Sequence, residues 1–228
     1  MTTTDSHAPN LAETMARLRG AQKGHARGAP AYSVYVNRRI GRLFAAMAYR
    51  LGLTPNRVTL VSAVHTFIGV ALIATVPPSL WSGVLIALLL VAGYAWDSAD
   101  GQVARLRGGG SVAGEWLDHF VDALKIASLH LAVLIGLYRF GDLGEVALLV
   151  PIGYSVIATV TFFGMILNDL LKGARGVAST HTRGGGTFGR SMVLLPTDFG
   201  VLCLAFLLWG VSPLFLAVYG ALFAANAQ

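Results

Sequence analysis

Charge and cysteine are both scarce in this sequence. Only 12% of the 228 residues are charged, whereas 55% are hydrophobic, and the mean hydropathy is +0.64. These values fit an integral membrane protein better than a soluble domain. The single cysteine, Cys203, excludes a disulfide framework and a thiolate metal site, because each of these needs several thiols.

Acidic residues are also few, 11 against 17 lysines and arginines, and the formal net charge is +6. A positive charge can indicate nucleic-acid binding, but no constellation of basic and aromatic residues accompanies it here. Most of the basic residues flank hydrophobic runs, where they orient a membrane protein and meet anionic lipids. We therefore expect the basic residues to contact membrane lipid and not nucleic acid.

Six hydrophobic runs approach the ~20 residues that are needed to span a bilayer. They lie at residues 58–76, 80–96, 117–138, 143–167, 192–209 and 213–225. They predict an all-α fold, a polytopic membrane protein with six transmembrane helices. The sequence contains no visible internal repeat, which disfavours an inverted-repeat transporter.

The region before the first run divides into two parts. Residues 1–30 are polar and contain no apolar core of signal-peptide length, so we expect a flexible cytoplasmic tail. Residues 31–56 place apolar side chains at helical spacing between arginines, which predicts an amphipathic helix in the headgroup layer. Residues 57–228 then form the six-helix transmembrane domain.

Basic residues are distributed unevenly between the two sides of the predicted spans. Fifteen of them precede the first span or lie in the loops after the second and fourth spans. Arg139 alone lies on the other side, and Lys125 lies inside a span. The positive-inside rule therefore predicts a cell-membrane protein with both termini at the cytoplasmic face.

Four aspartates fall within one stretch of 26 residues. Asp97 and Asp100 are three residues apart, and Asp118 and Asp122 are four apart, so on helices each pair projects from one face. The glycines at 108–110 supply a flexible joint that lets the two pairs face each other. Four facing carboxylates repel unless cations hold them, and oxygen ligands suit Mg²⁺, Mn²⁺ or Ca²⁺.

The stretch reads Asp-x2-Asp-Gly-x2-Ala-Arg-x8-Gly-x3-Asp-x3-Asp. Its eight fixed positions are Asp97, Asp100, Gly101, Ala104, Arg105, Gly114, Asp118 and Asp122. This pattern closely resembles the motif of the CDP-alcohol phosphotransferases, with no departure at any fixed position. The resemblance extends more weakly to residues 54–59 and to the pattern of spans from about residue 31, and it does not cover the first 30 residues.

The resemblance implies a membrane enzyme of phospholipid biosynthesis. It transfers a substituted phosphate group from a CDP-alcohol to the hydroxyl of a small polar alcohol or alcohol phosphate, and it releases CMP. CDP-diacylglycerol is the first donor implied, although a soluble donor such as CDP-inositol uses the same motif. The family commonly forms homodimers, so a homodimer is expected.

The resemblance also implies a role for each motif residue. Two divalent ions, Mg²⁺ or Mn²⁺, would be held by Asp97, Asp100, Asp118 and Asp122, and Asp122 would also be the general base. The small residues of the motif would leave room for CDP, and its arginine would pair with a phosphate oxygen. These nucleotide-binding residues are Gly101, Ala104, Arg105 and Gly114.

Other polar residues carry weaker predictions. Asn56 and Thr59 are candidates for the nucleotide, although capping of the first span explains them equally well. A further group of basic side chains is a candidate for an anionic acceptor, although ordinary positive-inside charge explains them too. This group comprises Lys172, Arg175, Arg183 and Arg190.

The residues alone leave other functions open. Intramembrane prenyltransferases also bind a diphosphate through Asp-rich helices, but they usually present two separate motifs on a larger bundle. A divalent-cation transporter needs polar residues along its path, and the last two runs offer almost none beyond Asp198. An ion-pair network of the carboxylates with Arg105 and Arg107 would need neither the glycines nor the spacing.

Overall fold

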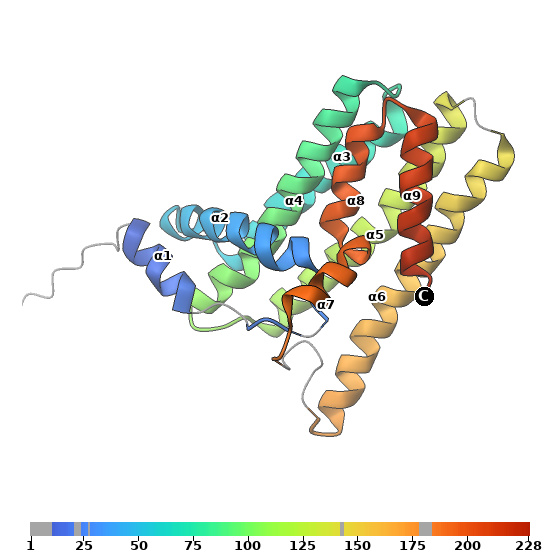
Figure 1. The fold of residues 1–228 in the computed structure, drawn as a ribbon. Coiled ribbons are helices and arrows are strands. Elements are labelled where there is room, and N and C mark those ends of the chain that lie inside the picture. The colour runs from blue at the N-terminus through green and yellow to red at the C-terminus, as the bar shows by residue number, and fades with distance from the viewer. Residues whose placement is uncertain (1–10, 21–23, 27, 142–143, 178–183) are drawn as a thin grey trace, which may run out of the picture.

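The computed structural model describes residues 11–20, 24–26, 28–141, 144–177 and 184–228, and every regular element in these residues is helical. In chain order the elements are α1 (Leu11–Gly20), the π-helical turn η1 (Ser33–Asn37), α2 (Arg38–Arg50), α3 (Pro55–Thr75), α4 (Leu80–Leu106), α5 (Val112–Phe140), η2 (Glu145–Leu148), α6 (Leu149–Ala174), α7 (Phe188–Val193), η3 (Leu195–Thr197), α8 (Phe199–Ala205), η4 (Phe206–Leu208) and α9 (Ser212–Asn226). Helices α3, α4, α5, α6, α8 and α9 stand side by side, and α1, α2 and α7 lie at one end of this bundle (Figure 1). The all-α fold is confirmed.

Four helical segments are long and apolar enough to cross a membrane, namely α3, α4, α5 and the continuous segment Glu145–Ala174 that contains α6. The fifth and sixth predicted spans correspond to shorter apolar helices, Phe199–Leu208 and Ser212–Asn226. The fifth run starts at residue 192, but the chain turns through Pro196, which cannot donate a helical hydrogen bond, before α8 begins. The count of six spans is therefore not confirmed.

Helix α4 continues beyond the hydrophobic run that predicted it, from residue 96 to Leu106, so the first half of the acidic motif lies within the helix. Gly108 and Gly109 then adopt positive φ angles of 92° and 135°, which favour glycine, and they turn the chain toward α5. Ser111 caps α5 by accepting a hydrogen bond from the Gly114 backbone at 3.0 Å. The second half of the motif is therefore helical as well.

Glycines set the closest helix contacts of the bundle. A Cβ atom on Gly93 of α4 would lie 2.3 Å from the Thr66 Oγ1 and 3.2 Å from the Ser62 carbonyl oxygen on α3. The Ser62 hydroxyl donates to the Gly93 carbonyl at 2.8 Å, so the two backbones are also joined by a polar contact. Small residues with short hydroxyl side chains are the usual means by which membrane helices approach each other closely.

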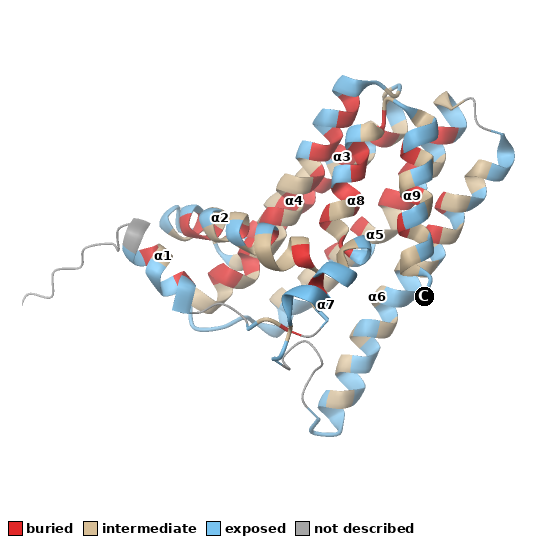
Figure 2. Ribbon diagram, viewed as in Figure 1, coloured by how far each residue is buried: buried red, intermediate tan, exposed pale blue. Residues whose placement is uncertain are grey.

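The outer surface of the bundle is apolar, most clearly on α6. Only 11% of the most apolar window of Glu145–Ala174 is buried inside the protein, and α6 is largely exposed in Figure 2. Val156, Val160 and Phe163 are each more than half exposed. A surface of this kind is typical of a helix that faces lipid, since water would meet a large continuous apolar patch there.

The segments before the bundle rest on α4. Helix α2 crosses α4 where Gly41 lies against Ser98, and α1 packs on α2 and α4 with Leu18 buried. The buried Asp198, which caps α8, accepts hydrogen bonds from the backbone and hydroxyl of Ser33 at 2.7 and 3.2 Å. The flexibility predicted for residues 1–30 stays a prediction, and residues 1–10 lie outside the described part of the chain.

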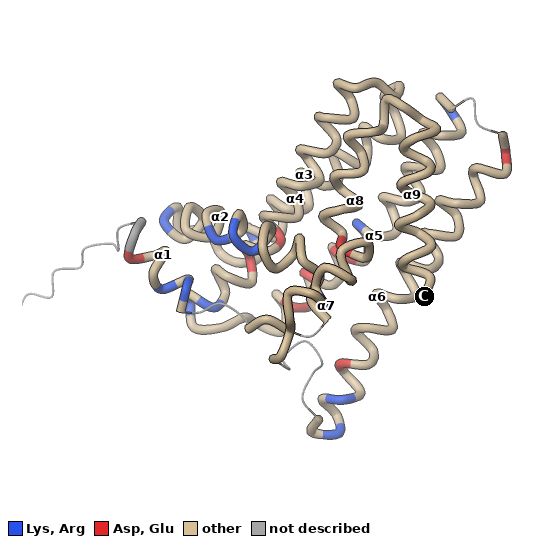
Figure 3. The backbone as a smooth tube through the Cα atoms, in the orientation of Figure 1, with Lys and Arg blue, Asp and Glu red and all other residues tan. Residues whose placement is uncertain are grey.

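Basic side chains are concentrated at the end of the bundle where α1 and α2 lie. They occur on α1, on α2 and at the end of α6, whereas Arg139 lies in the last turn of α5 at the other end (Figure 3). The acidic motif, at the end of α4 and the start of α5, is at the basic end.

Replacing Gly93 with Ala is expected to destabilise the protein by about 1–3 kcal/mol, because the added methyl group over-packs the contact between α3 and α4. The measurement is the midpoint of thermal unfolding in detergent, together with the monodisperse fraction. Gly164→Ala on α6 is the matched control, since a Cβ there meets nothing within 4 Å. Equal midpoints for both variants would contradict the close contact.

Candidate active site

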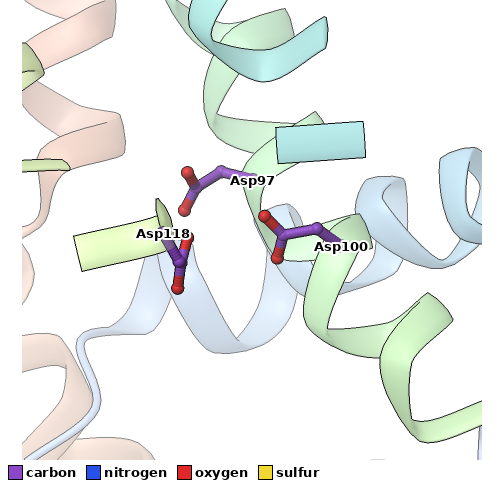
Figure 4. A group of neighbouring side chains, drawn as sticks. All are labelled: Asp97, Asp100 and Asp118. Atoms are coloured by element: carbon purple, nitrogen blue, oxygen red, sulfur yellow. The ribbon is translucent and has the colours of Figure 1, made fainter. Parts of the chain in front are cut away.

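Three motif carboxylates converge between α4 and α5. Asp97 and Asp100 project from α4 toward Asp118 on α5 (Figure 4). One oxygen atom from each carboxylate lies within 4.8 Å of the other two. The spacing predicted that four carboxylates would face each other, and three of the four converge here.

Hydroxyl groups on α3 hold two of these carboxylates. The Thr59 hydroxyl donates to Asp100 Oδ2 at 2.7 Å, and the Ser62 hydroxyl lies 3.4 Å from Asp97 Oδ1. The same hydroxyl oxygen lies 3.2 Å from the carbonyl oxygen of Pro55, at the start of the helix. Thr54, rather than Asn56 or Thr59, caps α3. Thr59 therefore orients a motif aspartate directly.

The three carboxylates fit a hard divalent cation. Mg²⁺ prefers oxygen ligands at about 2.1 Å, and two such ligands can be no more than about 4.2 Å apart, so small side-chain rotations would close this triangle. Asp100 is 7% exposed, and buried charges of one sign require a positive partner. Asp97, Asp100 and Asp118 would hold the ion, which would supply positive charge for a phosphate.

Asp122 does not belong to this three-oxygen cluster. It lies one turn after Asp118 on α5, and its Oδ1 is 3.2 Å from the ammonium of Lys125. The same ammonium forms an ion pair with Asp97. Lys125 thus links the fourth motif carboxylate to the cluster, although it is not one of the eight motif positions.

A cavity of about 850 Å³ opens beside the carboxylates, between the start of α3, the end of α4 and the start of α5. It is lined by every residue that the sequence assigned to the nucleotide: Asn56, Thr59, Gly101, Ala104, Arg105 and Gly114. A side chain at Gly114 would crowd this cavity, because a Cβ there would lie 3.0 Å from the Asn56 Oδ1 and 3.1 Å from the Ser111 hydroxyl.

A second cavity, of about 260 Å³, lies on the other side of the cluster. Two guanidinium groups line it, from Arg38 on α2 and Arg105 on α4, together with the three clustered carboxylates. The four residues that line both cavities are Asp100, Gly101, Arg105 and Asp118. The two cavities therefore meet at the carboxylates.

The basic residues predicted for the acceptor lie elsewhere. Lys172 and Arg175 are at the end of α6, and Arg190 is exposed on α7, and none of these three lines either cavity. Arg183 lies outside the described residues. Their assignment to the acceptor stays a prediction.

Lys125 and Arg38 lie beside the clustered carboxylates and were not assigned to the site by sequence reasoning. Lys125 had a detectable signal, because it is a lysine inside a hydrophobic run, three residues after Asp122 and therefore on the same helix face. Arg38 had none, because it is one of several arginines on an amphipathic helix, and only the crossing of α2 over α4 brings it to the site.

Replacing Gly114 with Leu is expected to weaken CDP binding roughly 5- to 150-fold, because over-packing at such a contact costs about 1–3 kcal/mol. The measurement is calorimetric titration of the purified protein with CDP. Gly164→Leu, at a helical glycine with no atom within 4 Å of an added Cβ, is the control and should bind as wild type does. Unchanged CDP affinity in Gly114→Leu would remove this cavity as the nucleotide site.

Comparison with known proteins relates this geometry to a family. Residues 52–226 match the family described as CDP-alcohol phosphatidyltransferase. A phosphatidylinositol phosphate synthase from Corynebacterium glutamicum is 33% identical over 159 residues, 69% of this chain and 66% of the relative. An archaetidylinositol phosphate synthase from Pyrococcus horikoshii is 33% identical over 98 residues, 43% of this chain and 47% of the relative. The chain thus spans just under two thirds of the first relative and about half of the second.

A solved structure shares the fold. The crystal structure of a Mycobacterium tuberculosis phosphatidylinositol phosphate synthase with CDP-DAG bound aligns over 84% of this chain and 87% of the other, with a TM-score of 0.51 and 23% sequence identity. The match of the family extends from the start of α3 to the end of α9 and includes all eight motif positions. The chain belongs to the CDP-alcohol phosphatidyltransferase family.

Proposed function

We propose that this protein transfers a phosphatidyl group from CDP-diacylglycerol to the hydroxyl of a small polar alcohol phosphate, and releases CMP. The observation that carries the proposal is the meeting of two cavities at three clustered carboxylates. The larger cavity has the predicted nucleotide residues, and the smaller has two guanidinium groups. Such an arrangement suits two substrates that meet at a phosphate.

The reaction forms one bond and breaks another at the same phosphorus atom. The acceptor oxygen attacks the phosphorus that bears the diacylglycerol, the bond from that phosphorus to the bridging oxygen breaks, and CMP leaves. Divalent ions held by the aspartates would neutralise the diphosphate charge. The proton of the acceptor hydroxyl passes to a carboxylate, and we assign this role to Asp122.

The arginines of the smaller cavity complement this charge. Arg105 lines both cavities, and its planar guanidinium matches two phosphate oxygens. Arg38 approaches the same space from α2. We propose that this pair binds phosphate groups of the two substrates at the point where they meet.

Inositol phosphate is the acceptor that we propose first, because the curated relatives are named as synthases of phosphatidylinositol phosphate and archaetidylinositol phosphate. The excess of basic residues at the same end of the bundle favours an anionic acceptor (Figure 3). By the positive-inside rule, the same excess supports an active site and an N-terminus at the cytoplasmic face. The proposal also includes the homodimer that the resemblance implied.

Purified protein with Mg²⁺ and CDP-diacylglycerol is expected to release CMP only when inositol 1-phosphate is added. The measurement is CMP release by chromatography, with glycerol 3-phosphate, inositol and serine tested separately and EDTA as the metal-free control. Release with another acceptor would replace inositol phosphate in the proposal. If no acceptor gives CMP release with CDP-diacylglycerol, but CDP-inositol does give release, then CDP-inositol would replace the lipid donor in the proposal.

Asp122→Asn is expected to reduce turnover at least about 10²-fold, because an amide cannot accept the hydroxyl proton and general base catalysis contributes about 10²–10⁴-fold. CDP affinity should stay at the wild-type value, since Asp122 lines neither cavity. The measurement is the rate of CMP release beside a CDP titration. Wild-type turnover in this variant would remove Asp122 as the base.

A further inference from the structure

Lys125 is a buried cation that the proposed reaction does not use. It lies on α5 and is 5% exposed. Its ammonium forms an ion pair with Asp97 Oδ1, lies 3.2 Å from Asp122 Oδ1 and donates to the Ser62 hydroxyl at 3.0 Å. An ammonium has three N–H donors, and here three oxygen atoms surround it. Its hydrogen-bonding capacity is therefore fully used.

The position of this ammonium is set by three helices. Asp97 comes from α4, Asp122 lies three residues before Lys125 on α5, and Ser62 comes from α3. Ser62 itself donates to the carbonyl of Gly93, where α3 and α4 pack closely together. A buried lysine is unfavourable in an apolar bundle unless carboxylates compensate it, and removing one member of such a group leaves a charge without compensation.

We propose that Lys125 is the internal counter-cation of Asp97 and Asp122, a positioning residue that holds the Asp122 carboxylate toward the cluster and lowers the affinity of the site for divalent ions. The positioning of Asp122 rests on the proposed function. The effect on ion binding rests only on the contacts of the ammonium with two motif carboxylates.

The formal charges explain why such a cation is useful. The four carboxylates carry four negative charges, and Lys125 reduces them to three. One divalent ion then leaves one negative charge, and two leave one positive charge, so an anionic diphosphate is favoured only when both ions are present. Without the lysine, two divalent ions and four carboxylates would sum to zero charge. The site would then attract an anionic diphosphate less strongly.

The test is binding of Mn²⁺ to purified protein in detergent without substrate, followed by the electron paramagnetic resonance signal of free Mn²⁺. Lys125→Met is expected to bind Mn²⁺ at least about tenfold more tightly than wild type, because a unit positive charge beside the ligands has been removed. Lys125→Arg keeps that charge and should stay near wild type. Arg139→Met removes a positive charge from the same helix about 21 Å away, by a rise of 1.5 Å per residue, and should have no effect.

Turnover supplies the second readout. Lys125→Met is expected to release CMP about 10–100-fold more slowly, as is usual when the partner of a metal-site carboxylate is lost. The KM for the CDP-alcohol is expected to rise as well, because two ions without the lysine leave no net positive charge to attract the diphosphate. Lys125→Arg should restore part of the rate.

Unchanged or weaker Mn²⁺ binding by a folded Lys125→Met protein would overturn the counter-cation role and leave the lysine a purely structural one. If Lys125→Met does not fold, Mn²⁺ affinity is compared between wild type and Lys125→Gln, where the same tightening is expected. Because ion binding is measured without substrate, a wild-type protein that releases no CMP would refute the proposed function and leave this inference standing.

Discussion

The electrostatic repulsion among three clustered carboxylates, one buried and two partly buried, is the constraint on which this structure depends. Asp97, Asp100 and Asp118 approach each other between two apolar helices, where low dielectric strengthens their repulsion. The neighbouring helix α3 supplies hydroxyl contacts to Asp100 and Asp97, and Lys125 supplies a positive charge. The bundle therefore holds the carboxylates in a geometry that suits the binding of a divalent cation.

These contacts require α3 and α4 to be close together. The glycine at position 93 permits this approach, and the hydroxyl of Ser62 then bonds both to its carbonyl and, through Lys125, to the acidic motif. A continuous series of hydrogen bonds thus connects the close helix contact at Gly93 with the charged residues of the site. A change in helix packing about one turn from the motif would be transmitted to the carboxylates, since a close-packed interior has little room to absorb it.

The continuation of α4 past its hydrophobic run shapes the cavities. Because α4 extends to Leu106 and α5 begins at Val112, the motif lies on two helix ends that leave the apolar part of the bundle together. The start of α3 closes one side and α2 covers the other. The two cavities therefore lie where the motif leaves the apolar part of the bundle, while α6 keeps a largely exposed apolar surface.

The all-α fold and the approach of three motif aspartates were predictable from the hydrophobic runs and from a spacing that places side chains on one helix face. The six residues proposed for the nucleotide came from the family resemblance, and all of them line the larger cavity. The count of six spans is not confirmed, because hydrophobicity does not reveal where a helix such as α8 is interrupted and shortened. The positions of Arg38 and Ser62 beside the carboxylates, and the pairing of Lys125 with Asp97, were decided only by tertiary structure, since contacts between helices distant in sequence depend on packing.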